Sequence, residues 1–447
     1  MTRAALSGAL MALAWAAILG AALFSLPTEQ IAVGAVLGFL ALEALATSRL
    51  TRLHLTVGAS LAGAVWLVSD AAGQDFLAAA FRASFIMVLF SSLGMLQNAV
   101  MRNQSFIAAG EMLVRQPPGR QYYALSGGTT LFGSVLNFGV LPLMGGLVKA
   151  AQPGASPAQE KRLMLALLRG FSVVMFWCPL TVAYAITTTT IEGLDWPLMT
   201  AAGICLAMLV IGLGRRFNMA SGAQAKGQVT EPFRWPALFP ILALLVGLSA
   251  LAALVDILTP AALVHGVILF VPLTAIFLFW LFDPASARAE ATRYLGEDIA
   301  MQRNEVAVLG NAALSGALIA TLLPQQTLLA LLGSALPVVL VPALCLWVVV
   351  LLGQAGLNPL ITVAALASIL SRPASIGIDP TLMGLALVVG WGLAVGSSSA
   401  AAATMSIGRV AGESAWRVGT AWNGLFTLVA SLIAGGVLTL LGFVMHP

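Results

Sequence analysis

The stretch Gly353-Gln354-Ala355-Gly356-Leu357-Asn358-Pro359 interrupts a long apolar segment, residues 328–370. Glycine permits a tight reversal of the backbone, asparagine caps the start of a helix, and proline suits its first turn. The stretch therefore predicts a helical hairpin whose returning helix starts at Asn358 and Pro359. Backbone amides without helical partners would lie at the tip of this hairpin.

The composition places most of the chain in lipid. Of its 447 residues, 60% are apolar and 9% are charged, whereas soluble domains carry about 25% charged residues. This excludes water-soluble enzymes, nucleic-acid binders and disordered scaffolds. The three cysteines lie in apolar runs and the three histidines are scattered, so we expect no disulfide framework, no metal site, no catalytic residue and no cofactor.

Eleven apolar windows have a length and hydropathy suited to crossing a bilayer. They cover residues 4–24, 31–47, 55–68, 76–96, 163–190, 197–213, 235–255, 262–282, 306–323, 382–407 and 418–444. Two further segments, 122–150 and 328–370, are broken at their centres by Asn and Gly. We expect both to be re-entrant hairpins, in an all-α integral membrane protein.

The distribution of positive charge supports this topology. With the N-terminus in the cytoplasm and both broken segments returning to their side of entry, all but two of the 21 Lys and Arg residues fall on the cytoplasmic side. The two exceptions are Arg82 and Arg372. Such sorting is typical of multi-pass proteins, and it predicts a bacterial-type inner-membrane protein with a periplasmic C-terminus.

Two charged residues fall inside or near predicted spans. Glu43 lies late in the second span, and we expect its side chain to extend to the cytoplasmic face. Arg169 lies just inside the fifth span. A membrane-embedded charge would be a functional candidate, but we expect Arg169 to reach water at the cytoplasmic end.

The chain divides into two halves, residues 1–214 and 235–447, joined by a polar cytoplasmic linker, 215–234. The first half has a hairpin at 122–150 and a broken helix at 163–190. The second has a hairpin at 328–370 and a broken helix at 382–407. The odd number of spans between the two hairpins predicts inverted repeats, an arrangement typical of secondary transporters.

Four backbone breaks, two in each half, form the candidate site. Irregular backbone is tolerated at membrane depth only where protein or a water-filled cavity satisfies its polar groups. Half-helix N-termini attract anions, and nearby carbonyl and hydroxyl oxygens can bind sodium. We expect Asn137 and Asn358 to cap the two hairpin tips, and one of three consecutive serines to cap the last half-helix. The candidate residues are Ser134, Asn137, Gly139, Cys178, Pro179, Thr181, Gly356, Asn358, Pro359, Ser397, Ser398 and Ser399. The alternative is that these small residues only allow close helix packing.

This layout resembles that of the ion transporter superfamily, which includes the divalent anion/sodium symporters, the arsenite permeases and the membrane subunits of tripartite periplasmic transporters. The resemblance rests on the order of hairpins and broken helices, with Leu136-Asn137-Phe138 and Leu357-Asn358-Pro359 at the tips. The symporters have Ser-Asn-Thr there, so only the asparagines match. The resemblance implies substrate and cation sites at the tips and breaks, and a homodimer.

The function expected is secondary active transport of a small anionic metabolite by alternating access, coupled to sodium or protons. The partners would be that solute and the lipid bilayer, with no nucleic acid. Three alternatives stay open: the membrane subunit of a tripartite, binding-protein-dependent system, a membrane-embedded enzyme of envelope lipid or glycan synthesis, and a channel.

Overall fold

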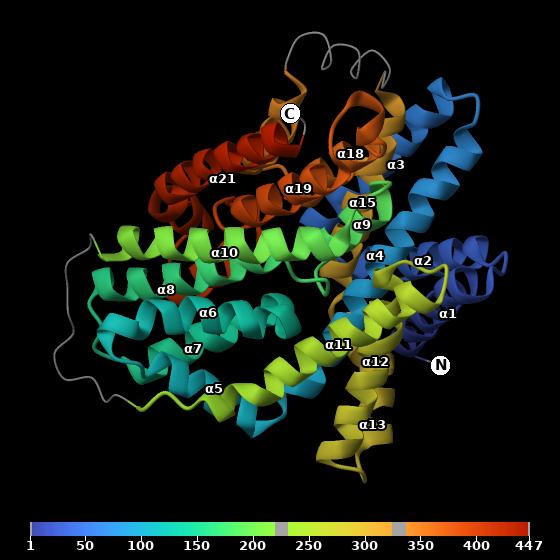
Figure 1. The fold of residues 1–447 in the computed structure, drawn as a ribbon. Helices are drawn as coiled ribbons and strands as arrows, with labels where there is room; N and C mark the ends of the chain where they lie inside the picture. The colour runs from blue at the N-terminus through green and yellow to red at the C-terminus, as the bar shows by residue number, and fades with distance from the viewer. Residues whose placement is uncertain (1, 220–230, 324–336, 446–447) are drawn as a thin grey trace. The chain divides into compact units, whose positions relative to one another are not determined.

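A computed structural model describes residues 2–219, 231–323 and 337–445, and every regular element within these ranges is a helix (Figure 1). In this part of the chain, 10 helices are long and apolar enough to cross a membrane by length and composition, and three shorter apolar helices accompany them. The all-helical membrane fold class is therefore confirmed. Residues 220–230 of the predicted linker and 328–336 of the second predicted hairpin lie outside the described residues.

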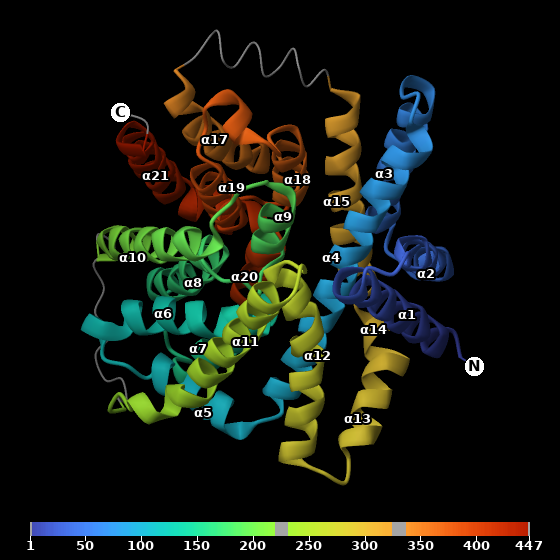
Figure 2. The same ribbon diagram turned by 45° about the vertical axis from the view of Figure 1, so that its right-hand side comes forward.

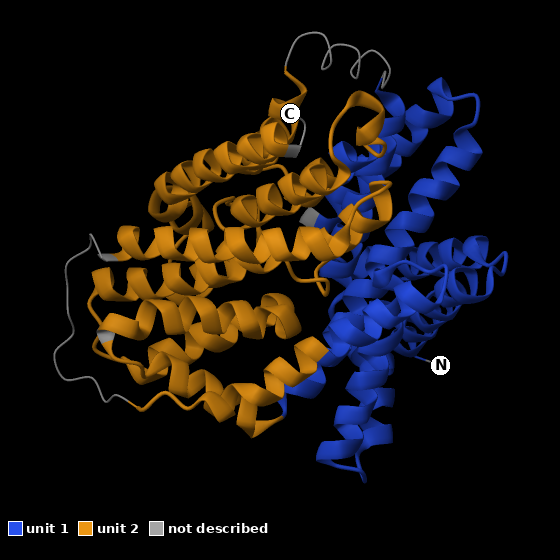
Figure 3. Cartoon of the chain, viewed as in Figure 1, with its two compact units in different colours: residues 1–102, 247–328, 364–369 blue, residues 103–246, 329–363, 370–447 orange. Residues whose placement is uncertain are grey.

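The helices group into two compact units (Figure 3). Unit 1 comprises residues 1–102, 247–328 and 364–369, and unit 2 comprises residues 103–246, 329–363 and 370–447. Each unit thus contains segments from both halves of the chain. The division into halves with inverted repeats is a sequence-level prediction that these packing units do not test.

Unit 1 is built around three long neighbouring helices. In it, α15 packs against α3 and α4, α12 packs against α4, and α1 packs against α2 (Figure 2). Its elements are α1 (Arg3–Phe24), α2 (Glu29–Glu43), the short 3₁₀ helix Ala44–Ala46, α3 (Arg49–Val68), α4 (Ala72–Met101), α12 (Leu263–Phe282), α13 (Ala287–Arg293), the π-helix Tyr294–Asp298, α14 (Ile299–Met301) and α15 (Arg303–Leu322).

The side chain of Glu43 is buried in unit 1 and does not reach water, so that expectation was wrong. Its side chain is only 1% exposed and accepts a 2.6 Å hydrogen bond from the hydroxyl of Ser7. Its other carboxylate oxygen lies 3.4 Å from Arg3 Nη2 and 3.9 Å from Arg303 Nε. The carboxylate is directed inward because α1 packs on α2 and two cations neutralise its charge.

Unit 2 contains all four predicted breaks. In it, α6 packs against α8, and α17 packs against α19 and α21. Its elements are α5 (Gln104–Val114), α6 (Pro118–Leu136), η2 (Asn137–Gly139), α7 (Val140–Ala151), α8 (Pro157–Ser172), η3 (Val173–Phe176), α9 (Val182–Thr190), α10 (Trp196–Met219), η4 (Trp235–Leu238), η6 (Val338–Leu340), α17 (Val341–Gln354), η7 (Pro373–Ile376), α19 (Pro380–Val395), α20 (Ala402–Ala411), the π-helix η8 (Arg417–Trp422) and α21 (Asn423–Met445). Two helices, α11 (Phe239–Leu258) and α18 (Pro359–Ile369), start in unit 2 and end in unit 1.

Candidate functional site

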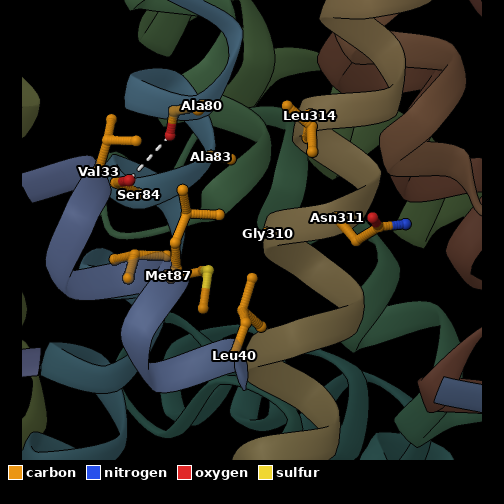
Figure 4. A pocket seen from close by; sticks show the side chains of 11 residues that line it. Val33, Leu40, Ala80, Ala83, Ser84, Met87, Gly310, Asn311 and Leu314 are labelled. Carbon is orange, nitrogen blue, oxygen red and sulfur yellow. Dashed lines mark hydrogen bonds between the residues drawn. The ribbon is translucent and has the colours of Figure 1, made fainter. Parts of the chain in front are cut away.

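A small cavity in unit 1 is lined by side chains of α2, α4 and α15 (Figure 4). Its volume is about 30 Å³ and most of its lining is aliphatic, with Met87 and Leu314 among the lining residues. The Ser84 hydroxyl is already bonded to the Ala80 carbonyl oxygen, and the Asn311 amide donates to the His54 carbonyl oxygen. A cavity of this size has room for about one water molecule. It cannot hold a metabolite, and the helix breaks of unit 2 are the better candidates.

The first break separates α6 from α7, which lie against each other and against α8. At this break the backbone of Asn137 has φ 49° and ψ −136°, a conformation that residues other than glycine rarely adopt. The expected cap was wrong: α7 starts after Gly139 without a side-chain cap bond. Within residues 2–219, 231–323 and 337–445, the Asn137 side chain makes no hydrogen bond. The backbone of Asn137 forms the turn, and its side-chain amide is therefore available to a ligand.

The third break lies between η3 and α9, where the sequence predicts it. Pro179 is buried in the turn that joins the two elements. Thr181 is the N-cap of α9: its hydroxyl accepts from the Tyr184 amide at 3.3 Å and donates to the Cys178 carbonyl at 2.9 Å. The hydroxyl thus fixes both the turn and the start of the half-helix.

The first and third breaks meet in the interior of unit 2. The sulfur of Cys178 lies 3.9 Å from the backbone carbonyl oxygen of Ser134, and both residues are buried. The Ser134 hydroxyl is turned back to the Leu131 carbonyl oxygen at 2.6 Å. The structure therefore brings together two candidate residues that are 44 positions apart in the sequence.

The second break has the geometry that its sequence predicts. Gly356 has φ 95°, and the amide of Leu357 donates to the Leu352 carbonyl oxygen at 3.0 Å, which closes α17 in a Schellman-type turn. The Asn358 side chain then accepts a 3.0 Å hydrogen bond from the Leu360 amide, and α18 begins at Pro359. Asn358 is thus a helix cap, unlike Asn137.

The fourth break separates α19 from α20, but the predicted serine cap was wrong. The N-cap of α20 is Ala401, without a side-chain cap bond. The serines precede the helix start by too many residues, so Ser397 bonds back to Leu393 and Ser398 accepts from the Ala400 amide. Ser399 is half-buried.

Thr404 stabilises the turn of the fourth break from within α20. Its hydroxyl lies 2.5 Å from the Ser398 carbonyl oxygen and 2.9 Å from the Ala401 carbonyl oxygen. The Ala401 carbonyl also accepts the first backbone hydrogen bond of α20, from Met405, and the Ser398 carbonyl lies in the turn before the helix. The Thr404 hydroxyl therefore links the irregular backbone to the half-helix.

The two broken helices cross at closely packed glycines. The helix α19 packs against η3. A Cβ atom at Gly392 would overlap the carbonyl oxygen of Ser172, and one at Gly396 would overlap the Ser172 hydroxyl. The absence of side chains at these glycines lets α19 and the start of the fourth break pack closely on the end of α8 and on η3.

Arg169 does not reach water, so that expectation was wrong as well. The residue is 2% exposed. Its Nε donates to Asn423 Oδ1 and its Nη1 donates to the Gly214 carbonyl oxygen, both at 2.9 Å. Its guanidinium carbon lies 4.2 Å from the ring centroid of Phe426. The reason is packing: α8 is covered by α6 and α10 at this depth.

Sequence reasoning missed Asn423, which joins Arg169 to the fourth break. Its Nδ2 donates to the carbonyl oxygen of Gly396 at 2.8 Å, and the residue is 1% exposed. The sequence did contain a signal, since Asn423 is a lone asparagine within an apolar span. Polar residues are rare in such spans, and those that occur face the protein interior.

Comparisons with known proteins support the fold. No protein-family model matches the sequence, and a comparison with curated proteins finds no match. The structure is similar to the crystal structure of the YdaH transporter of Alcanivorax borkumensis, which is described as having an unusual topology. The TM-score is 0.56 at 16% sequence identity, and the match covers 88% of this chain and 98% of YdaH. At this identity the likeness shows the fold alone, which is that of an all-helical, multi-pass membrane protein.

Proposed function

We propose that the protein is a secondary active transporter that moves a small anionic metabolite across the cytoplasmic membrane by alternating access. The observation that carries this proposal is the meeting of the first and third breaks, where the Cys178 sulfur lies 3.9 Å from the Ser134 carbonyl oxygen. Interrupted helices that meet inside a membrane protein are the usual setting for solute and ion sites in secondary transporters. The transporter fold supports the same proposal.

The local chemistry favours an anionic solute. The half-helix α9 begins at the third break and α20 begins at the fourth, and the first amides of a helix point toward any anion at its N-terminus. The free side-chain amide of Asn137 adds a further donor. Carbonyl and hydroxyl oxygens at the same breaks suit a small cation, so sodium is a candidate coupling ion alongside protons.

The arrangement in the membrane is part of the same proposal. We propose that α6 and α7 form a re-entrant hairpin, that α17 and α18 form its counterpart in an inverted repeat, and that the protein is a homodimer. The close packing of α6 on α7 supports the first hairpin. The charge distribution supports a cytoplasmic N-terminus and a periplasmic C-terminus.

A ligand screen followed by uptake tests this function. Purified protein is heated with a panel of small anionic and neutral metabolites, in sodium chloride or in choline chloride. A solute that binds the folded protein raises its melting temperature. Each solute found is then supplied to proteoliposomes under a sodium gradient or a pH gradient. Saturable accumulation driven by either gradient is expected, and passive equilibration of every solute found would contradict the proposal and indicate a channel.

A further inference from the structure

Arg169 carries a positive charge that its surroundings do not cancel. It contacts the side-chain oxygen of Asn423, the carbonyl oxygen of Gly214 and the ring of Phe426, and the hydroxyl of Tyr122 lies beside it. All four groups stabilise a cation, and none is a carboxylate. Within the described ranges of the chain, Arg169 forms no ion pair with Asp or Glu, although buried charges are normally paired.

Asn423 places this charge next to the fourth break. One end of its amide accepts from Arg169 Nε at 2.9 Å, and the other end donates to the Gly396 carbonyl oxygen at 2.8 Å. Gly396 is the first residue of the break that leads into α20. The guanidinium is therefore one amide group away from the irregular backbone of the candidate site.

The charge persists and its field reaches the break. Arginine is not deprotonated in proteins, so burial does not neutralise it. In a medium less polar than water, the potential of a unit charge extends further than it does at a protein surface. A solute at the fourth break would experience this potential without touching the guanidinium.

We propose that Arg169 selects the charge of the solute: its uncompensated buried charge makes the potential at residues 396–400 positive, so the site prefers an anion. Arg169 acts on the solute through its electrostatic potential and not by contact, and the hydrogen bond to Asn423 holds the guanidinium in position. This inference rests on the proposed function for its biological meaning. The potential itself, however, can be measured without any substrate.

A cysteine reporter measures the potential. Cys178, Cys205 and Cys345 are replaced by alanine, and Ser399, which is half-buried, is changed to cysteine. The reporter is then treated with two thiol reagents of similar size, the anionic sulfonatoethyl and the cationic trimethylammonioethyl methanethiosulfonates. The readout is the ratio of the anionic to the cationic reaction rate, relative to the ratio for a free thiol.

Three variants separate charge from structure. Arg169→Met removes the charge, Arg169→Lys keeps it, and Asn423→Asp cancels it while Arg169 stays in place. A unit charge at roughly 10 Å in a medium as polar as water changes the ratio roughly fourfold, and a drier site increases the effect. We expect Arg169→Met and Asn423→Asp to lower the ratio by at least this factor, and Arg169→Lys to retain it.

A control cysteine checks that the effect is local. Ala374 is exposed and lies before the start of α19, whereas Gly396 follows the end of this helix. A helix of 16 residues is roughly 24 Å long, so the two positions are about this far apart. The ratio at Ala374→Cys should not respond to any of the three variants.

The outcome that overturns the proposal is an unchanged ratio at position 399 in a variant that purifies as a single species and melts near the parent. If Arg169→Met does not fold, Asn423→Asp decides the question alone. An unchanged reagent ratio would not contradict gradient-driven uptake, and a lack of uptake would not contradict a measured positive potential. The two proposals can therefore be disproved independently.

Discussion

The sulfur of Cys178 lies 3.9 Å from the carbonyl oxygen of Ser134, so the turn after η3 touches the last turn of α6. A thiol is a weak donor, and this contact contributes little to stability. Its importance is positional, because it joins two interrupted helices in the interior of unit 2.

The crossing of α19 with the end of α8 and with η3 should tolerate no added side chain. A Cβ atom at Gly392 would overlap the Ser172 carbonyl oxygen, whereas one at Gly436 on α21 would have nothing within 4 Å. Overpacking of this kind costs about 1–3 kcal/mol. We expect Gly392→Ala to lower the melting temperature in detergent by several degrees, with Gly436→Ala as the matched control that melts like the parent. Equal melting of the two variants would contradict the tight crossing.

Variants of Asn137 can distinguish the role of its backbone from the role of its side chain. Its φ of 49° suits glycine, and the strain on another residue there costs about 1–3 kcal/mol. We expect Asn137→Gly to melt at or above the parent temperature and Asn137→Ala to melt below it, as measured by thermal unfolding in detergent. Since the Asn137 amide is proposed to face the solute, both variants should lose transport. A stable, fully active Asn137→Gly variant would show that the side chain has no part in binding.

Asn358 should behave differently, because its side chain is a helix cap. Loss of its 3.0 Å hydrogen bond to the Leu360 amide in Asn358→Ala should destabilise the protein by about 1 kcal/mol. Aspartate keeps the cap oxygen, so Asn358→Asp should melt near the parent temperature. Thermal unfolding of the two variants side by side measures this. A lower melting temperature for Asn358→Asp than for Asn358→Ala would mean that the cap does not stabilise α18.

The buried carboxylate of Glu43 should stabilise unit 1. In Glu43→Gln the ion pairs with Arg3 and Arg303 are lost around a residue that is 1% exposed. Weakening a buried, charge-assisted network of this kind costs about 1–3 kcal/mol. We expect a clearly lower melting temperature, whereas Glu29→Gln, at the exposed start of the same helix, should have no effect. An unchanged melting temperature for Glu43→Gln would contradict the stabilising role of the buried network.

The fold class and the positions of the breaks could be predicted from sequence because each depends on local chemistry. Long apolar windows indicate spans, and Gly356, Asn358 and Pro359 carry the turn and cap preferences that the structure shows. The surroundings of Glu43 and Arg169 could not be predicted in this way. Hydropathy gives the depth of a residue along its own helix, but the partners that cover it come from distant segments, such as Asn423 for Arg169. The serine cap was mispredicted for a simpler reason. The start of a helix can be placed from sequence only to within a few residues, and α20 begins after Ala401 instead of directly after the serines.

Gradient-driven uptake by a double variant at the two tips tests the central claim most directly. Asn137→Gly keeps the backbone turn and Asn358→Asp keeps the cap, so their combination alters the tip side chains with little change in structure. Proteoliposomes containing the parent or the double variant are compared for uptake of a solute found in the screen, after matched melting temperatures have been verified. The account predicts that the double variant loses most of the uptake. Uptake at the parent rate would show that the solute site lies elsewhere and that the breaks serve only packing.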